Sequence, residues 1–193
     1  MYDALISYIK SLSTTPLTEA EIEVIKAAFV PKRIRKRQYF LQEGQVCKHV
    51  AFVVQGAMRQ YSVDEKGAGH ITRLFIENSW VTDRESYAML ISSAFNIDAW
   101  EDCDVLVVKG DDFLKLLKSI PAINDMLLKL SENFVIATQK RVASLTLPAE
   151  ERYAELIKTN PEFLQRFPQH IIASYLGLTR ETLSRVRGYA VKK

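Results

Sequence analysis

Charged and hydroxyl side chains alternate with apolar ones in the segment LTRETLSRVRGYA, residues 178–190. At about 100° per residue, an α-helix would gather the larger apolar side chains on one arc: Leu183, Val186, Tyr189 and Ala190. The polar side chains would gather on the opposite arc: Arg180, Glu181, Ser184, Arg185 and Arg187. Arginine can donate two hydrogen bonds to guanine, and glutamate can accept one from cytosine. This helix would therefore pack by one face and leave base-recognising side chains free on the other.

A glycine separates this helix from another one that is expected immediately before it. The preceding apolar residues have the spacing of one helix face: Ile171, Ile172, Tyr175 and Leu176. Gly177 permits the positive φ that ends a helix, and Thr179 is a suitable N-cap for the next one. Two helices joined by a short glycine turn can place the second in the DNA major groove. The alternative is a surface helix whose charges are only solvated; the turn, the cap and the segregation of side chains together favour DNA.

The run IASYLGLTRETLSR resembles the helix-turn-helix of the cyclic-AMP receptor protein and fumarate-nitrate regulator (Crp/Fnr) family of bacterial transcription factors. The resemblance implies that Arg180, Glu181 and Arg185 contact bases, with Thr182 or Ser184 facing phosphates or neighbouring bases. It also implies a homodimer on an inverted-repeat site in double-stranded DNA, with RNA polymerase as an expected further partner. The predicted DNA-binding residues are Thr179, Arg180, Glu181, Ser184, Arg185 and Arg187.

The family commonly adds a β-hairpin wing after this helix. No wing is expected here, where Lys192 and Lys193 would replace part of its contact with the DNA backbone. From Thr179 onward there are five basic residues and one acidic residue, whereas the whole chain carries a net charge of only +3. This local surplus is the electrostatic footprint of a phosphate-binding surface.

Short runs rich in Val, Ile, Phe and Tyr alternate with turn signals from Lys32 to Val108, as is typical of a sandwich or barrel. Within them, EGQVCKHVAFVVQGAMRQY resembles the β-roll of the family's effector domain, with Arg59 as its outward-facing arginine. The implied fold class is α+β: a cyclic-nucleotide-binding-like β-roll (jelly roll), a long dimerisation helix and a helix-turn-helix domain. The implied domains are residues 1–118, 119–147 and 148–193. Before the strands, Thr18 and Glu21 form a predicted capping box for a helix that extends to Phe29.

Family members that bind cyclic AMP use a Gly-Glu pair for the ribose and an Arg-Ser/Thr-Ala triplet for the phosphate. The pair falls near Thr82 and Asp83 in this chain, and the triplet falls on Ser93, Ala94 and Phe95. The phosphate-binding arginine is therefore missing, and burying a phosphate without a cation would cost several kcal/mol. We expect no response to cyclic AMP and an occluded or differently shaped pocket for an unknown small-molecule effector. Its candidate residues are Arg59, Trp80, Asp83, Arg84, Ser93 and Ala94, of which Arg84 is a possible substitute cation.

A long helix is expected between Pro121 and Pro148. Its first apolar stripe has coiled-coil spacing and predicts a dimerisation seam: Ile123, Leu127, Leu130, Phe134 and Ala137. Residues seven apart form a second stripe: Leu128, Val135 and Val142. A helix with two stripes can pack on its own domain and on a partner at once. The alternative is a helix buried within one monomer.

Two further patterns suggest sites but have simpler interpretations. The basic run KRIRKR, residues 32–37, could bind nucleic acid, but a solvated edge strand with Ile34 turned inward is favoured. Cys47 and His49 could bind a metal, but two further ligands are missing, so a core cysteine and a surface histidine are expected. The two cysteines, Cys47 and Cys103, are also too few for a four-cysteine iron-sulfur cluster.

The sequence thus favours a cytosolic, homodimeric transcription regulator that needs no cofactor or metal. The N-terminus lacks a signal peptide, and no apolar run approaches a membrane span. The alternative is a small-molecule-binding or protein-interaction module whose helix-turn-helix no longer recognises DNA. An enzyme is the least favoured, because no catalytic set stands out and the three histidines (His49, His70 and His170) lie in unrelated contexts.

Overall fold

The computed structural model describes residues 1–190, with side chains to residue 188. Lys192 and Lys193, and the side chains of Tyr189 and Ala190 on the predicted apolar arc, lie outside the described residues. Two helices precede the strands: α1 (Tyr2–Leu12) and α2 (Glu19–Ala28). The capping box of α2 is confirmed, because Thr18 Oγ1 accepts from the Glu21 N–H and a Glu21 carboxylate oxygen accepts from the Thr18 N–H. Helix α1, which buries Leu5, Ile6 and Ile9, was not predicted from the sequence.

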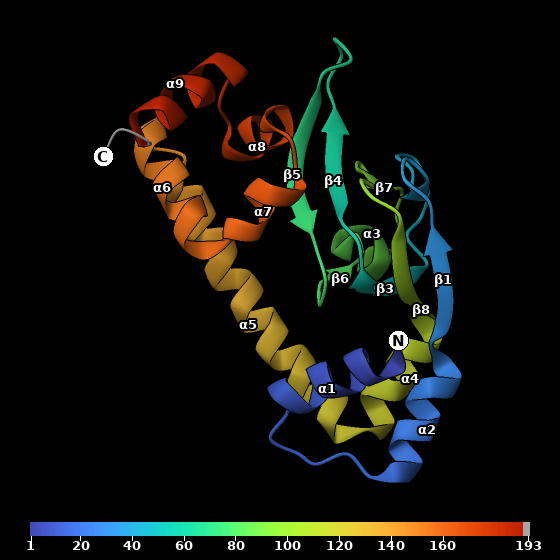
Figure 1. Ribbon diagram of the computed structural model, residues 1–193. Coiled ribbons are helices and arrows are strands. Elements are labelled where there is room, and N and C mark those ends of the chain that lie inside the picture. Colours follow the sequence, from blue (N-terminus) through green and yellow to red (C-terminus); the bar gives the residue numbers. More distant parts are fainter. Residues whose placement is uncertain (191–193) are drawn as a thin grey trace.

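Two antiparallel sheets of four strands form the centre of the N-terminal half (Figure 1). One sheet has the order β1 (Val30–Ile34), β8 (Cys103–Lys109), β3 (His49–Gln55) and β6 (Trp80–Val81). The other has the order β2 (Tyr39–Leu41), β7 (Asn96–Ala99), β4 (Met58–Val63) and β5 (Gly69–Phe75). A buried cluster that includes Met58, Ile97 and Val105 joins the two sheets.

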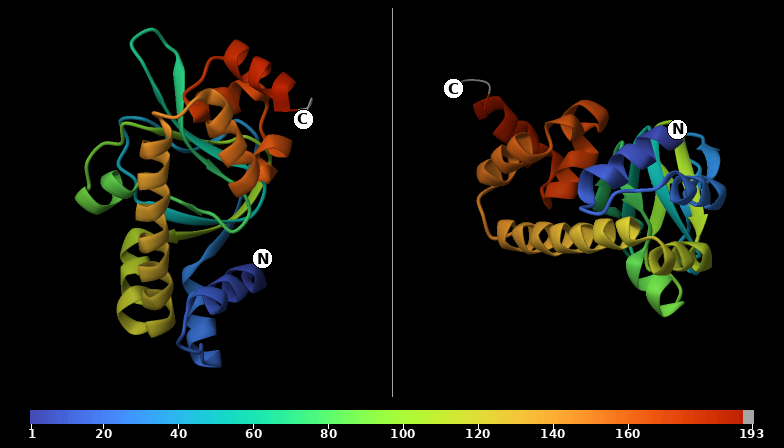
Figure 2. Two further views of the ribbon diagram at one scale, coloured as in Figure 1. Left: turned by 90° about the vertical axis from the view of Figure 1, so that its left-hand side faces the viewer. Right: turned by 90° about the horizontal axis from the view of Figure 1, so that it is seen from below.

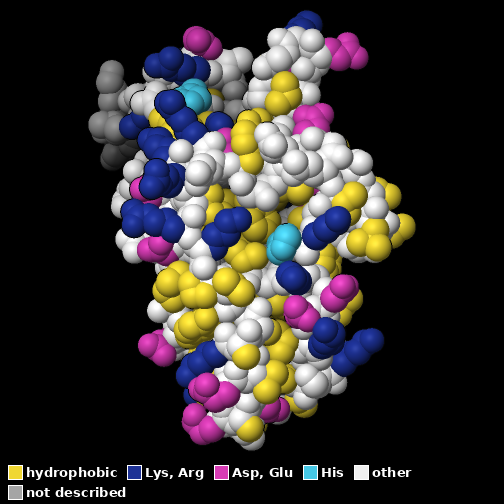
Figure 3. Space-filling view, turned by 90° about the vertical axis from the view of Figure 1, so that its right-hand side faces the viewer, with side chains coloured by type: hydrophobic (Ala, Val, Ile, Leu, Met, Phe, Trp, Pro, Cys, Tyr) yellow, Lys and Arg dark blue, Asp and Glu magenta, His cyan; other side chains and the backbone are white. Residues whose placement is uncertain are grey.

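The first strand, β1, is the edge strand that the KRIRKR pattern favoured. It pairs only with β8, and its Ile34 is buried while the neighbouring basic side chains are exposed. Arg33 is within 3.3 Å of Asp102, and the Lys36 N–H donates to the same carboxylate. Figure 3 views the molecule from the side on which Figure 1 shows β1; Lys and Arg side chains gather toward the upper left of this face, and Asp and Glu side chains are scattered around and below them. The run is therefore part of a solvated surface.

Three helices complete the region around the sheets: α3 (Arg84–Met89), α4 (Gly110–Ser119) and α5 (Pro121–Ser144). The predicted long helix is α5, which begins at Pro121 and ends four residues before Pro148. Its first turns contact α1 and α4, and they contribute Ala122, Ile123 and Met126 to a second core beneath β3 and β8. Figures 1 and 2 show α5 running along one side of the molecule from this core to the C-terminal helices.

Four helices form the C-terminal part: α6 (Ala149–Thr159), α7 (Pro161–Arg166), α8 (Gln169–Leu176) and α9 (Arg180–Ala190). The bounds of α6 follow from two prolines, because Pro148 precedes the helix and Pro161 starts the next one. Their core includes Tyr153, Phe163, Ile172, Leu183 and Val186. Ile71 and Leu74 of β5 belong to the same cluster, so these helices are docked on the second sheet (Figure 2).

Candidate DNA-binding site and effector cavity

The turn between α8 and α9 has the predicted conformation. Gly177 ends α8 at a φ of +66°, which a residue with a Cβ atom rarely adopts. The Leu178 N–H donates to the Ala173 carbonyl over 2.9 Å, which closes the end of α8. The Thr179 hydroxyl accepts from the Thr182 N–H over 3.2 Å and caps the start of α9. These local contacts fix the direction in which α9 leaves the turn.

The side chains of α9 are divided between two faces. Leu183 and Val186 are only 1% and 2% exposed. All residues of the predicted DNA-binding set are exposed: Thr179, Arg180, Glu181, Ser184, Arg185 and Arg187. The backbone N–H of Glu181 and the Thr179 hydroxyl lower the pKa of the Glu181 carboxyl. Within residues 1–188, the structure shows no ion pair of Arg180, Arg185 or Arg187, so their guanidinium groups are free to meet an external acceptor.

The apolar face of α9 should determine the stability of the whole C-terminal unit. We expect Leu183→Ala to lower the free energy of unfolding by about 2–5 kcal/mol, because it leaves a cavity in a fully buried position. Leu183→Met, which nearly conserves volume, should cost less than about 1.5 kcal/mol. Urea unfolding followed by circular dichroism measures both, and equal stability of Leu183→Ala and the wild type would contradict the packing described here.

Polar contacts attach the C-terminal helices to the sheets. Arg166 of α7 donates over 2.9 Å to both Glu77 and Glu101, which lie in turns of the sandwich. The Ser174 hydroxyl of α8 accepts from the Ile71 N–H of β5 over 2.9 Å. Arg141 of α5 donates to carbonyl groups of β5 and α8 at once. The candidate DNA-binding unit is therefore held against β5 by charged and neutral hydrogen bonds as well as by apolar packing.

A cavity of about 490 Å³ lies where β5, α3, α4 and α5 meet. Arg73 of β5 and Arg84 of α3 line it, and their guanidinium carbons lie 5.1 and 4.7 Å from the centre of the Phe134 ring. The remaining wall is largely apolar and includes Trp80, Phe113, Leu114, Leu117, Leu127 and Leu130. A cavity of this size and composition is suited to a small molecule with both apolar and charged parts.

The structure brings together only some of the predicted effector residues. Trp80 and Arg84 line the cavity, whereas Arg59 forms two hydrogen bonds of 2.8 and 2.9 Å with Asp98 on the neighbouring strand. Asp83 and Ser93 are buried and joined by a hydrogen bond of 2.6 Å. Ala94 is exposed. The expectation that Arg59 and Ala94 share a pocket with Arg84 is therefore wrong, because one is engaged elsewhere and the other faces solvent.

The predicted dimerisation seam on α5 is corrected by the burial of its residues. Ile123 is 1% exposed within its own chain, so it cannot contact a partner. Leu127, Leu130 and Phe134 face the cavity, and only Ala137 of the seam is exposed. The second stripe is on the free side of the helix, where Leu128, Val135 and Val142 are 59%, 53% and 62% exposed. The first stripe is therefore largely covered within its own chain, and the second stripe is the exposed one.

Comparisons with known proteins show which regulators this chain resembles in sequence and in fold. Residues 31–120 match the family described as the cyclic nucleotide-binding domain. The regulatory protein HlyX of Actinobacillus pleuropneumoniae is 24% identical over 189 residues, which cover 90% of this chain and 78% of HlyX. The structure of FixK2 from Bradyrhizobium japonicum has a TM-score of 0.73 at 21% identity, over 85% of each chain. A Crp/Fnr-family transcriptional regulator from Eubacterium rectale has a TM-score of 0.66 at 16% identity, over 91% of this chain and 85% of that one.

In sequence and fold the chain is of the Crp/Fnr type, and its residues 31–120 match the cyclic nucleotide-binding domain. It is a DNA-binding transcription regulator with a cyclic-nucleotide-binding-type sandwich, and this family is not one of enzymes. The predicted α+β fold is confirmed, including the long helix and the helical C-terminal region. No helix among residues 1–190 of this Crp/Fnr regulator has the length and hydrophobicity needed to span a lipid bilayer.

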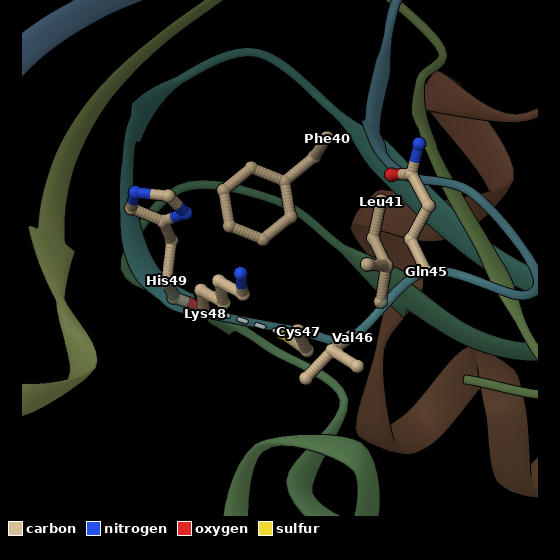
Figure 4. A pocket seen from close by; sticks show the side chains of 7 residues that line it. All are labelled: Phe40, Leu41, Gln45, Val46, Cys47, Lys48 and His49. Atoms are coloured by element: carbon tan, nitrogen blue, oxygen red, sulfur yellow. Dashed lines mark hydrogen bonds between the residues drawn. The ribbon is translucent and has the colours of Figure 1, made fainter. Parts of the chain in front are cut away.

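Cys47 and His49 behave as the simpler interpretation predicted. Cys47 is buried and its thiol donates to the His49 carbonyl, whereas the His49 side chain is exposed. Figure 4 shows the two side chains in a hollow of about 430 Å³, with the imidazole directed toward Phe40 and away from the thiol. The part of this regulator that the structure describes contains no group of three potential metal ligands.

Arg73 lines the cavity of this regulator, although the sequence did not indicate it as a site residue. It lies in the strand sequence GHITRLF, where an arginine among apolar residues resembles an ordinary solvent-facing position. Only the packing of α3 and α5 over β5 places it in a cavity. The sequence did indicate Arg84 as a candidate cation of a pocket. The spacing between Arg73 and Arg84, however, does not indicate that the two side chains line the same cavity.

Proposed function

We propose that this regulator is a homodimer that recognises an inverted-repeat DNA site through α9 and does not respond to cyclic AMP. The observation that carries the proposal is the division of α9 into a buried face, with Leu183 and Val186, and an exposed face with free arginines. Arg180, Glu181 and Arg185 lie in the first two turns, which enter the major groove in helix-turn-helix proteins. The bases contacted are guanine for each arginine and cytosine for the glutamate.

Dimerisation is proposed through the exposed stripe of α5. Leu128, Val135 and Val142 are spaced by seven residues, which places them along one line of a helix that pairs with a parallel copy. The exposed Ile136 widens this surface. A two-fold axis along α5 would present two copies of α9 to successive major grooves, so the half-sites should be about one helical turn apart.

The domain assignment follows the same proposal. Residues 1–118 form the effector domain, residues 119–147 form the dimerisation helix and its following turn, and residues 148–193 form the DNA-binding domain. Most of the core of the last domain comes from its own helices, although Ile71 and Leu74 of β5 pack into it, and α5 carries the chain from the first domain to the last. A module that has kept the fold but uses α9 to bind a protein is the alternative function.

Selection from fragmented genomic DNA tests the proposal against this alternative. The bound pool is sequenced for the wild type and for a variant with Arg180→Ala and Arg185→Ala. The proposal predicts enrichment of an inverted repeat by the wild type and loss of this motif in the variant. A pool with no motif, or with the same motif for both proteins, would favour the protein-interaction module or a different DNA-binding surface.

Cyclic AMP should not bind. Asp83 and Ser93, which are buried and hydrogen-bonded to each other, stand at the positions of the family's ribose-binding pair and phosphate-binding triplet. Ser93 replaces the arginine, and Asp83 would place a carboxylate near the phosphate. A phosphate buried there without a cation costs several kcal/mol of desolvation. Calorimetric titration should therefore show no heat of binding at micromolar protein concentration. A micromolar dissociation constant for cyclic AMP would contradict this part of the proposal.

A further inference from the structure

Three consecutive apolar residues at the end of α3 are left uncovered. Met89 and Leu90 are 69% and 72% exposed, the largest fractions among the large hydrophobic residues that the structure describes, and Ile91 is 48% exposed. Figure 2 shows α3 at the outline of the molecule in both views. An exposed run of this kind is unfavourable in water and marks a surface that another apolar body covers. We call residues 89–91 the α3 tip.

The backbone of the α3 tip is fixed in an unusual conformation. Leu90 has a φ of +54°, in the left-handed region that residues with a Cβ atom rarely adopt. Such a conformation is costly for leucine and persists only where the surrounding structure imposes it. Here the buried Ser86 donates its hydroxyl hydrogen to the Ile91 carbonyl over 2.6 Å. An anchored turn therefore presents the apolar side chains to the outside.

Cations lie beside the α3 tip, in a hollow of about 700 Å³ where the tip meets the starts of β3 and α4. Lys48 and Lys109 line this hollow, and Asp111 is the acidic residue in its wall. Within residues 1–188, the structure shows no ion pair of either lysine. Burial, followed by repulsion from Lys32 and these two lysines, lowers the pKa of His49 in the same hollow. The flank of the apolar tip is therefore positively charged.

The direction of α3 separates its tip from the surface proposed for the dimer. The helix begins against α5, where Arg84 donates to the Ser131 hydroxyl over 3.2 Å. It ends near the start of α4, where Leu90 and Leu114 line the hollow. The tip is therefore separated from the exposed stripe of α5 by the length of α3, so both surfaces are available at once.

Shape and charge distinguish between the candidate partners of the α3 tip. A projecting apolar tip beside unpaired lysines is complementary to a body that is anionic at its surface and apolar inside, as an anionic lipid bilayer is. A second copy would bring the same lysines against each other across a two-fold axis. A soluble small molecule in the hollow would leave Met89 and Ile91 uncovered, since neither residue lines it.

We propose that the α3 tip docks this protein reversibly onto an anionic lipid bilayer. Met89, Leu90 and Ile91 enter the boundary between headgroups and acyl chains, and Lys48 and Lys109 bind the phosphate groups of the lipids. Binding of this kind is peripheral and needs no spanning helix. It does not depend on the recognition of DNA by α9.

Flotation with lipid vesicles tests the proposal on the full chain. The vesicles are either pure phosphatidylcholine, which is neutral, or equal parts of phosphatidylcholine and anionic phosphatidylglycerol. We expect binding to the anionic vesicles to be at least tenfold stronger, because each lysine near an anionic surface contributes about fivefold. A salt concentration of about 0.5 M should weaken this binding by screening the lysines. Equal binding to both kinds of vesicle would overturn the proposal, and no binding at millimolar lipid would do so in favour of a protein partner.

Variants separate the apolar contribution from the charged one. Met89→Gln with Leu90→Asn removes the two most exposed side chains of the tip and should fold, because asparagine tolerates a positive φ. This tip variant should bind anionic vesicles at least tenfold more weakly. Lys48→Gln with Lys109→Gln should also weaken binding to anionic vesicles, by about fivefold for each lysine.

Matched controls change the same residue types elsewhere. Val24→Gln with Ile157→Gln removes two exposed apolar side chains, and Lys66→Gln with Lys158→Gln removes two exposed lysines. Both controls should bind vesicles as the wild type does. If the tip variant bound as well as the controls, the tip would not be the docking surface. Light scattering without lipid should give the tip variant the mass of the wild type; a lower mass would assign the tip to contact between copies and overturn the proposal.

Discussion

Arg180→Ala and Arg185→Ala should each weaken binding to the preferred DNA site by about 1–3 kcal/mol, or roughly 5- to 150-fold in Kd. The physical reason is the loss of two hydrogen bonds from an exposed guanidinium group to the major-groove edge of guanine. Affinity for random DNA should fall much less, since that binding depends on phosphate contacts. Fluorescence anisotropy with a selected fragment and with a scrambled fragment measures both affinities.

A matched control separates base recognition from general charge. Arg33→Ala also removes one exposed arginine, but on β1, where the side chain is paired with Asp102. It should leave both affinities nearly unchanged. If binding of selected and random DNA fell equally in the Arg180 and Arg185 variants, these residues would be phosphate contacts, and base recognition by them would be wrong.

The combined change Leu128→Asp and Val135→Asp should convert the dimer into a monomer and remove specific DNA binding. Two charges would be buried at the centre of the proposed apolar interface, where each is unpaired and faces its own copy across the two-fold axis. The side chains are exposed within one chain, so the monomer should keep its stability. Light scattering gives the molar mass, and thermal unfolding shows whether the fold survives.

The control for this change places the same acidic residues on another face of α5. Asn133→Asp with Lys140→Asp also alters two exposed positions seven residues apart, but they lie outside the apolar stripe and off the line of Ile136. This variant should remain a dimer. A dimer that survived Leu128→Asp and Val135→Asp would show that a different surface holds the two copies together.

Local features of this fold could be predicted from the sequence because neighbouring residues determine them. The capping box at Thr18, the positive φ of Gly177 and the N-cap at Thr179 each depend on a few adjacent residues. The helix-turn-helix is a combination of such features, so its surface residues could be predicted one by one.

Features that depend on packing between distant elements could not be predicted in this way. Periodicity identified two apolar stripes on α5, but only the position of the sandwich decides which stripe is covered by the same chain. Trp80 was predicted as a pocket residue and does line the cavity, but its packing against Phe113 of α4 could not be predicted from the sequence. Arg73 lines a cavity only because α3 and α5, which are separated from it in sequence, pack over β5.

The central claim is that two copies of α9 recognise guanines in successive major grooves. Dimethyl sulfate methylates guanine at N7, an atom that Arg180 and Arg185 would contact. Methylation interference on a selected fragment should therefore show two groups of sensitive guanines, about one helical turn apart and related by two-fold symmetry. The Arg180→Ala and Arg185→Ala variants should each lose part of this pattern in both half-sites. Binding that is unaffected by methylation at every guanine would contradict recognition of the major groove by α9.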